Sequence, residues 1–156
     1  MPPVTLTMDN WDRRFFGLCS LVGSWSEDKS RQIGCVIVGN ANEVRALGFN
    51  GLPRGVHGNV DERHSREGGE KYHWFEHAER NAIYNAARIG VAISGSRMYV
   101  SLHPCAECAR AIIQAGVASV HTFARPANDG YFDRSFEIAK TMLFEAGVPL
   151  LIYESQ

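Results

Sequence analysis

Apolar and polar residues follow two different periods along the chain, and each period predicts one type of element. Trp11, Phe15 and Val22 recur at helical spacing and predict a helix over residues 11–22. A short run rich in β-branched residues then predicts a buried strand over 33–38. The same criteria predict the remaining elements, which are a returning strand over 43–49, helices over 77–89, 105–115 and 132–146, and strands over 97–102, 117–123 and 150–153.

The order of these elements, α-β-β-α-β-α-β-α-β, predicts the fold class. Turn residues at 39–42 join the first two strands into an antiparallel hairpin. A helix separates each later pair of strands, which predicts parallel strands with right-handed crossovers. We therefore expect a three-layer α/β/α sandwich with a mixed five-stranded sheet. Residues 54–71 are polar and show no period, so we expect a long surface loop there.

The composition is that of a globular protein. The 156 residues are 45% hydrophobic and 21% charged, which fits one domain over 1–156. Sixteen Lys+Arg against seventeen Asp+Glu give a formal net charge of −1, which argues against a polynucleotide partner held by a broad basic surface. No apolar run approaches the ~20 residues of a membrane span. The first ten residues lack the regions of a signal peptide, so we expect a cytoplasmic protein without a membrane partner.

Two short motifs carry candidate chemistry, and both lie where a predicted helix begins. The first is His77-Ala78-Glu79, and the second is Pro104-Cys105-Ala106-Glu107-Cys108. Imidazole and thiolates are natural zinc ligands, so His77, Cys105 and Cys108 form a candidate zinc site. Three protein ligands leave one position for water, whose pKa zinc lowers to roughly 7. Glu79 follows His77 closely enough to take the water's proton and pass it to a ring nitrogen and a leaving amine.

Each of these residues also has an ordinary structural interpretation. His77 alone would be a core histidine, and Glu79 alone would be a first-turn carboxylate that favours the helix dipole. Cys105 and Cys108 could form a dithiol redox pair, although such pairs usually follow the first strand of a thioredoxin-like unit. Together, however, H-x-E followed by P-C-x-x-C is the signature of zinc-dependent nucleobase deaminases.

At these motifs the chain resembles the cytidine and deoxycytidylate deaminase superfamily, and within it the deoxycytidylate (dCMP) deaminases. The similarity extends from about Ser26 to Val148, and the Asn-Gly-x-Pro-x-Gly stretch at 50–55 favours the dCMP branch. The stretches that carry it are residues 32–38, 48–55, 77–83, 98–109 and 112–117.

The resemblance implies an activity and a set of roles. It implies hydrolysis of dCMP to dUMP and ammonia, with zinc-bound hydroxide attacking C4 of the base and Glu79 shuttling protons. It assigns the zinc to His77, Cys105 and Cys108, and it makes Asn50 a hydrogen-bond partner of the sugar. For Asn50 the alternative is plain turn chemistry, since Asn-Gly is a good turn pair.

The resemblance also implies partners beyond the substrate. Members of the family are homo-oligomers, often hexamers, and many are activated by dCTP and inhibited by dTTP with Mg²⁺. Arg54, in the turn at 52–55, is where we expect an effector site. Arg88 is a candidate for a subunit contact, with a helix C-terminal cation as the alternative.

Outside the zinc motifs, the sequence offers several candidate residues for contacts with the substrate. The loop that begins at residue 125 lacks the tyrosine that dCMP deaminases carry just after the preceding strand. Tyr131 is the candidate substitute for stacking or phosphate contact, with a surface aromatic residue as the alternative. A nucleotide also needs a cation at its 5′ phosphate, for which Arg31, Lys29 and Arg54 are the candidates. Histidines in and beside the predicted loop, together with Cys19 or Cys35, could form a second metal site. The alternative for the two cysteines is that they are small buried apolar residues. These histidines are His57, His64 and His73.

Three hypotheses about function follow from these observations. The first is a dCMP deaminase. The second is a deaminase of another nucleoside or nucleobase, such as cytidine, cytosine or guanine, or, less compatibly with the balanced charge, of adenosine in tRNA. The third is a zinc-binding module without catalysis, against which the retained Glu79 and the missing fourth protein ligand argue.

Overall fold

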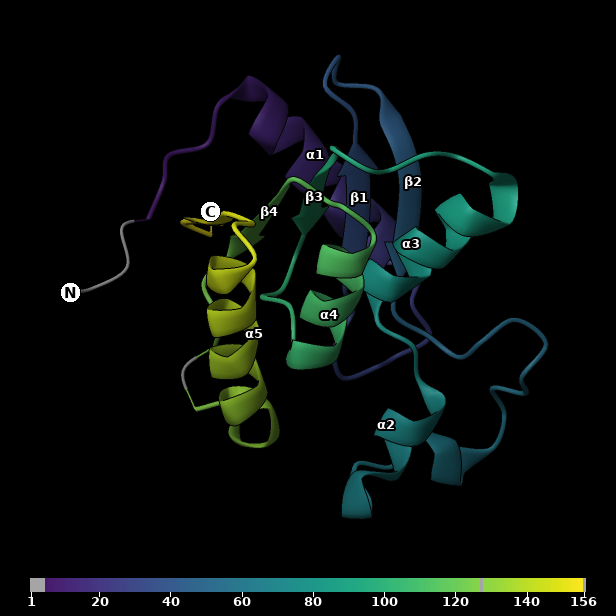
Figure 1. The fold of residues 1–156 in the computed structure, drawn as a ribbon. Helices are drawn as coiled ribbons and strands as arrows, with labels where there is room; N and C mark the ends of the chain where they lie inside the picture. The colour runs from purple at the N-terminus through teal and green to yellow at the C-terminus, as the bar shows by residue number, and fades with distance from the viewer. Residues whose placement is uncertain (1–4, 127, 156) are drawn as a thin grey trace.

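The computed structural model describes residues 5–126 and 128–155, and its elements follow the predicted order (Figure 1). The elements are α1 (Asn10–Gly23), β1 (Gly34–Val38), β2 (Val44–Phe49), α2 (Glu70–Trp74), α3 (Ala78–Ile89), β3 (Arg97–Val100), α4 (Ala106–Gln114), β4 (Ser119–Phe123), α5 (Asp133–Glu145) and β5 (Leu150–Tyr153). Three short 3-10 turns complete them, which are η1 (Asp61–His64), η2 (Glu67–Gly69) and η3 (Gly130–Phe132).

One prediction needs correction. The segment over 54–71 is not a plain loop, because it contains η1 and η2 and leads into α2. These turns are only three to five residues long, which is too short for a hydrophobic period to show in the sequence. Gly68 and Gly69 adopt positive φ angles of 62° and 75°, so the chain can turn sharply between η2 and α2.

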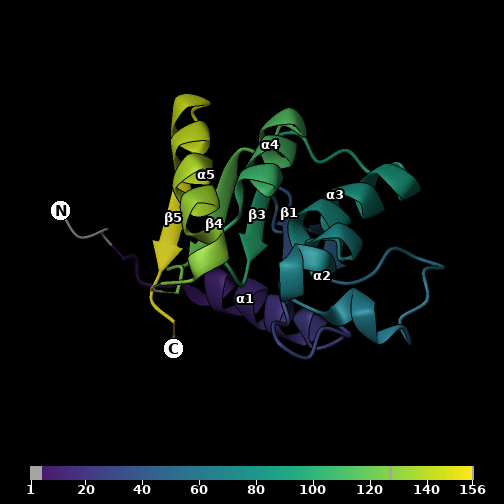
Figure 2. The same cartoon turned by 90° about the horizontal axis from the view of Figure 1, so that it is seen from below.

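The sheet has five strands in the order β2-β1-β3-β4-β5 and is mixed, as predicted. β1 pairs antiparallel with β2 and with β3, whereas β3, β4 and β5 are parallel. Helix α1 covers one face of the sheet, and α3, α4 and α5 cover the other (Figure 2). The predicted three-layer sandwich is therefore confirmed.

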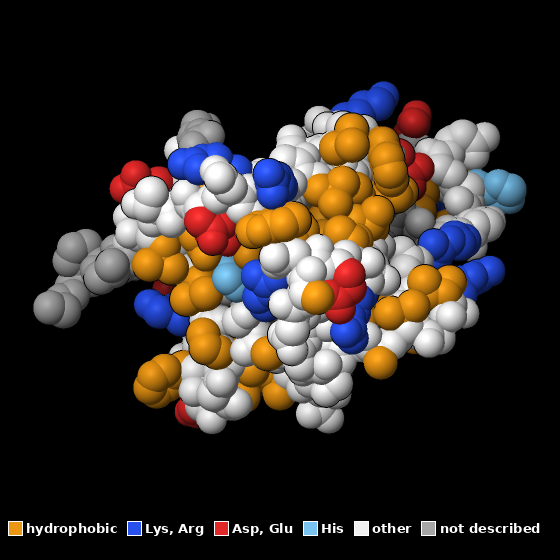
Figure 3. All heavy atoms as spheres, turned by 90° about the horizontal axis from the view of Figure 1, so that it is seen from above, with side chains coloured by type: hydrophobic (Ala, Val, Ile, Leu, Met, Phe, Trp, Pro, Cys, Tyr) orange, Lys and Arg blue, Asp and Glu red, His pale blue; other side chains and the backbone are white. Residues whose placement is uncertain are grey.

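The surface carries charges of both signs. On the face that Figure 3 shows, basic and acidic side chains are interspersed among hydrophobic ones. Among the described residues, no helix combines the length and the apolar composition needed to cross a membrane.

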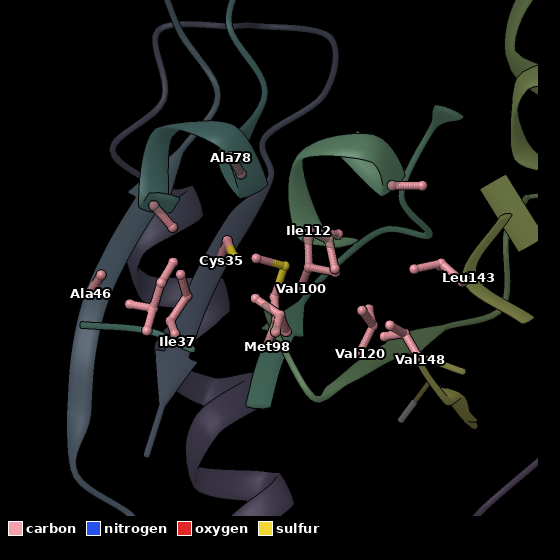
Figure 4. Close-up of a cluster of buried hydrophobic side chains, with 14 of the residues drawn as sticks. Cys35, Ile37, Ala46, Ala78, Met98, Val100, Ile112, Val120, Leu143 and Val148 are labelled. Atoms are coloured by element: carbon pink, nitrogen blue, oxygen red, sulfur yellow. The ribbon is translucent and has the colours of Figure 1, made fainter. Parts of the chain in front are cut away.

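The main core lies between the sheet and helices α3, α4 and α5. Ile37, Met98 and Val120 extend from the sheet into this core (Figure 4). Helix α3 approaches β2 so closely that a Cβ at Gly48 would lie 2.3 Å from the amide nitrogen of Ala82. The same Cβ would lie 2.4 Å from the carbonyl oxygen of Ala78, so only glycine fits at this position.

The close approach at Gly48 can be tested with two glycine substitutions. Gly48→Ala should lower the free energy of unfolding by about 2–3 kcal/mol, because the contacting atoms are backbone and must shift. Gly17→Ala is the matched control, since nothing lies within 4 Å of a Cβ there and alanine favours the α1 helix by roughly 0.5–1 kcal/mol. Urea unfolding of both variants measures the difference in the free energy of unfolding. Equal values for the two variants would show that α3 can move to accommodate a Cβ at residue 48.

Candidate active site

Two helix N-termini bring the motif residues together. His77 is the N-cap residue of α3, and Cys105 is the N-cap residue of α4. Both have extended backbone conformations, and neither side chain accepts a capping hydrogen bond from its own helix. Their imidazole and thiol groups are therefore available to a partner outside the helix.

The three predicted ligand side chains form one cluster. The Sγ atoms of Cys105 and Cys108 each lie 3.4 Å from Nδ1 of His77. Sulfur and nitrogen ligands around one tetrahedral zinc ion are separated by about 3.6 Å, given Zn–S and Zn–N bonds of roughly 2.3 and 2.05 Å. The donor atoms and their spacing thus fit zinc, which His77, Cys105 and Cys108 would hold.

The electrostatic surroundings favour a thiolate in this cluster. Hydrogen bonding to Cys108 and to His77 lowers the pKa of Cys105 to about 4, against the opposing effect of burial. Burial would lower the pKa of His77, but its interactions with Cys105 outweigh this effect and raise it. The neighbours of Cys105 thus stabilise one thiolate, while burial raises the pKa of Cys108. Zinc binding would require both thiols and the imidazole to be deprotonated.

Glu79 lies in the first turn of α3, and its side chain is 4% exposed. It lines the same pocket as His77 and Cys105. Burial raises the pKa of this carboxyl group above its usual value. A raised pKa makes the carboxylate a stronger base that can accept a proton and hold it until it is transferred, which suits general acid–base chemistry.

The motif analysis missed a network of charges that supports the cluster. Glu76 accepts a hydrogen bond from the backbone N–H of His77, at 3.0 Å, and pairs with Arg80. Arg80 also pairs with Glu107, at 2.6 Å. The nearby Cys108 thiol contributes to the raised pKa of Arg80, against the effect of burial. This network connects the first turns of α3 and α4, and its only sequence signal is a run of charges around each motif.

His77 and Cys105 of the cluster line a pocket with a cavity volume of about 60 Å³. Cationic side chains lie in the lining as well, namely those of Arg31, Arg66 and Lys71. The aromatic part of the lining comes from Tyr72, Phe75, Phe132 and Phe136. Phe132 and Phe136 are one helical turn apart, whereas Tyr72 and Phe75 lie just after the segment over 54–71, for which the sequence shows no period.

Asn50 and Arg31, which were predicted to bind substrate, both line the pocket. The Asn50 side chain is buried, accepts a hydrogen bond from the Ile33 N–H at 2.8 Å, and donates one to the Arg31 carbonyl at 2.8 Å. It thereby holds the segment that precedes β1. The Arg31 guanidinium forms two hydrogen bonds with the Asp129 carboxylate, at 2.8 and 3.0 Å.

Tyr131 lies elsewhere than predicted. Its side chain is 66% exposed and stacks on Tyr72 at 4.5 Å between ring centroids, outside the pocket lining. The neighbouring Phe132 lines the pocket instead, because η3 turns residue 132 inward and residue 131 outward. The sequence could not distinguish these two adjacent aromatic residues without the backbone direction.

The other predicted cations lie on the surface. Arg54 donates a hydrogen bond to Asn85 on α3 at 2.6 Å, and Arg88 is exposed in the last turn of the same helix. Lys29 is exposed, and none of the three lines the pocket. Of the three candidates for a phosphate contact, only Arg31 is placed to reach a ligand in this pocket.

The hypothesis of a second metal site is wrong for the described part of the chain. There, the one group of three metal-binding side chains is His77, Cys105 and Cys108. Cys19 and Cys35 are fully buried, and burial raises the pKa of both thiols. They are small core residues, which was the alternative interpretation.

Comparisons with known proteins agree with this geometry. The family described as the cytidine and deoxycytidylate deaminase zinc-binding region matches residues 9–124. Human deoxycytidylate deaminase is 37% identical over 142 residues, which are 88% of this chain and 76% of the human protein. An uncharacterized deaminase of Aliivibrio fischeri is 36% identical over 144 residues, covering 90% of this chain and 92% of that one.

A solved structure is similar over nearly the whole chain. It is the dCMP deaminase of cyanophage S-TIM5 in complex with dCMP and dUMP, with a TM-score of 0.76 and 26% identity. The similarity covers 93% of this chain and 98% of the phage protein.

Removing one ligand should remove the metal. We expect purified protein to contain one zinc ion per chain, and Cys105→Ala to lower the zinc affinity by more than about 100-fold because one of three ligands is lost. Cys35→Ala is the matched control, since it deletes a buried thiol outside the cluster and should keep the zinc. Metal analysis after dialysis against a weak chelator reads out both variants, and zinc retained by Cys105→Ala would contradict the assignment.

Proposed function

The chain belongs to the cytidine and deoxycytidylate deaminase family, and on that premise we propose that it hydrolyses dCMP to dUMP and ammonia. The observation that carries the proposal is the position of Glu79, buried in the same pocket as the His77, Cys105 and Cys108 cluster. A zinc-binding module without catalysis would have no use for a buried carboxyl group there, because burying such a group is costly.

The chemistry divides between the metal and the protein. His77, Cys105 and Cys108 would hold a zinc ion, which would supply a Lewis acid able to make water a nucleophile at neutral pH. Glu79 accepts a proton from that water as its oxygen bonds to C4 of the cytosine ring. Glu79 then delivers protons to N3 and to the amino group, the C4–N4 bond breaks, and ammonia leaves. The two protons of the water thus end on N3 and on the ammonia.

The rest of the pocket supports a single pyrimidine nucleotide as the substrate. Aromatic side chains along the walls provide apolar surfaces on which a base can stack. Arg31 and Arg66 provide positive charge for a phosphate, whereas the charge of Lys71 is paired with the buried Asp28. Relatives named deoxycytidylate deaminase, and the phage enzyme solved with dCMP and dUMP, support the same substrate. The formal net charge of −1 gives no support to a polynucleotide substrate.

We also propose that the chain forms homo-oligomers, and that dCTP and dTTP with Mg²⁺ act on the assembly as effectors. The outer face of α3 supports the first part, because Tyr84 is 51% exposed and Ile89 is 67% exposed. Exposed large apolar side chains of this kind are found at protein interfaces. Arg54 and Arg88 lie on or against the same helix, where they could meet a second subunit or an anionic effector.

Substitution of Glu79 tests the proposed mechanism. Glu79→Gln and Glu79→Ala should lower kcat for dCMP by about 10³-fold or more, because neither side chain can shuttle a proton. Zinc content and the unfolding temperature should stay close to those of the wild type, since His77, Cys105 and Cys108 are unchanged. Ammonia and dUMP formation measure the activity.

Glu145→Gln, at the exposed end of α5, is the matched control and should keep full activity. If the zinc-loaded Glu79→Gln variant retained activity within tenfold of the wild type, Glu79 would not be the proton shuttle.

A further inference from the structure

Helix α4 begins at a residue whose side chain does not cap it. Cys105 is the N-cap residue, and its thiol group lies against His77 instead of accepting a hydrogen bond from the first turn of the helix. The first four N–H groups of an α-helix have no partner within the helix and need an acceptor from elsewhere. Ser, Thr, Asp or Asn at the N-cap usually provides one. A cysteine that is kept for a metal leaves this task to neighbouring groups.

Ser135, in the first turn of α5, provides one of these acceptors. Its hydroxyl oxygen accepts a hydrogen bond from the N–H of Ala106 at 2.8 Å. Ala106 is the first residue of α4 and directly follows Cys105. The hydrogen bond joins two different helices, so it fixes the start of α4 against the start of α5.

The same part of α5 also packs against the metal cluster. Phe136 is 2% exposed and belongs to one buried group of side chains with Cys105 and Cys108. Phe132, which directly precedes α5, packs against this group, and its ring lies 6.0 Å from the ring of His77 between centroids. Residues 132–136 therefore support the metal cluster from the side of α5, through a hydrogen bond and through aromatic packing.

The turn that carries Ser135 is itself held in place. The carboxylate of Asp133 accepts hydrogen bonds from the N–H groups of Asp129 and Gly130, at 3.1 and 3.2 Å. The Arg125 guanidinium donates a hydrogen bond to the carbonyl oxygen of Asp133 at 3.1 Å. These contacts tie the start of α5 to the loop before it, and a group that positions another needs such a support.

We propose that Ser135 is a positioning residue for the metal cluster, because it holds the first turn of α4 where its two cysteines can share a metal ion with His77. The proposal rests on the proposed function only in taking this cluster as a zinc site. Without the hydroxyl oxygen, the N–H of Ala106 would lose its acceptor, and the turn that carries both thiol groups would be less fixed. Zinc would then bind more weakly, since ordering the ligands would use part of the binding free energy.

Two substitutions of Ser135 test the role of its hydroxyl oxygen. Ser135→Ala should raise the zinc dissociation constant about tenfold, as expected when a group that orients metal ligands is removed. Ser135 is half-buried and alanine favours a helix, so this variant should fold. Ser135→Thr keeps an oxygen that can accept the same hydrogen bond, so its dissociation constant should stay within about threefold of the wild-type value.

Competition with a chromophoric chelator measures the dissociation constants. A value for Ser135→Ala within about twofold of the wild type would overturn the proposal. An equal loss of affinity in Ser135→Ala and Ser135→Thr would overturn it as well, because the hydroxyl oxygen would then not be what matters.

Loss of a different helix cap is the matched control. Asp9 caps α1, the helix on the opposite face of the sheet (Figure 2), and accepts a hydrogen bond from the Asp12 N–H at 2.8 Å. Asp9→Ala should lower the unfolding temperature of the zinc-loaded protein but leave the zinc dissociation constant unchanged, because α1 carries none of the three ligands. If Asp9→Ala weakened zinc binding as much as Ser135→Ala, general stability would explain the loss and the proposal would be overturned.

A spectroscopic readout keeps this proposal distinct from the proposed function. Co²⁺ bound in place of zinc has a visible absorption spectrum that depends on the geometry of its ligands. The spectrum of Ser135→Ala should differ from that of the wild type, whereas those of Ser135→Thr and Asp9→Ala should match it. This pattern, together with the weaker zinc binding, would support the proposal even if dCMP were not deaminated. Identical spectra in all four proteins would overturn the proposal even if dCMP were deaminated.

Discussion

The close contact between α3 and β2 is the constraint on which the site depends. Gly48 has no Cβ, so the backbone of α3 at Ala78 and Ala82 lies directly against the strand. His77 and Glu79 belong to the first turns of that helix and are placed by the same contact. The N-terminus of α4 lies beside these residues, because α4 connects the parallel strands β3 and β4 on the same face of the sheet. The distance between His77 and the two cysteines therefore follows from how the two helices pack on one sheet.

The polar groups of the site form two separate networks, one at the metal cluster and one beside the segment that precedes β1. At the cluster, Arg80 joins the two helix N-termini through Glu76 and Glu107, and it interacts with Cys108. Beyond the aromatic walls, the buried pair of Asp28 and Lys71 fixes the segment before β1. The reaction we propose needs both the metal cluster and the cationic part of the pocket. The metal and Glu79 would transform the base, while the cations hold the rest of the nucleotide in position.

The metal cluster could be predicted from sequence because its residues lie in two short motifs at helix N-termini. Within such a motif, the spacing along the chain determines which side chains lie together at the N-terminal end of the helix. The parallel strands followed in the same way from the regular alternation of elements. The remainder of the pocket could not be predicted. Arg66 and Lys71 reach it through turns too short to have a period, and the choice between Tyr131 and Phe132 depends on the backbone direction within η3.

The specificity of the purified, zinc-loaded wild-type protein tests the central claim most directly. Ammonia release should be measured on dCMP, CMP, deoxycytidine, cytosine and guanine, each with and without dCTP. The account predicts the highest kcat/KM for dCMP, with at least about a tenfold preference over deoxycytidine. Turnover of an unphosphorylated base or nucleoside with dCMP ignored would contradict it, because the cations of the pocket would then have no substrate phosphate to bind.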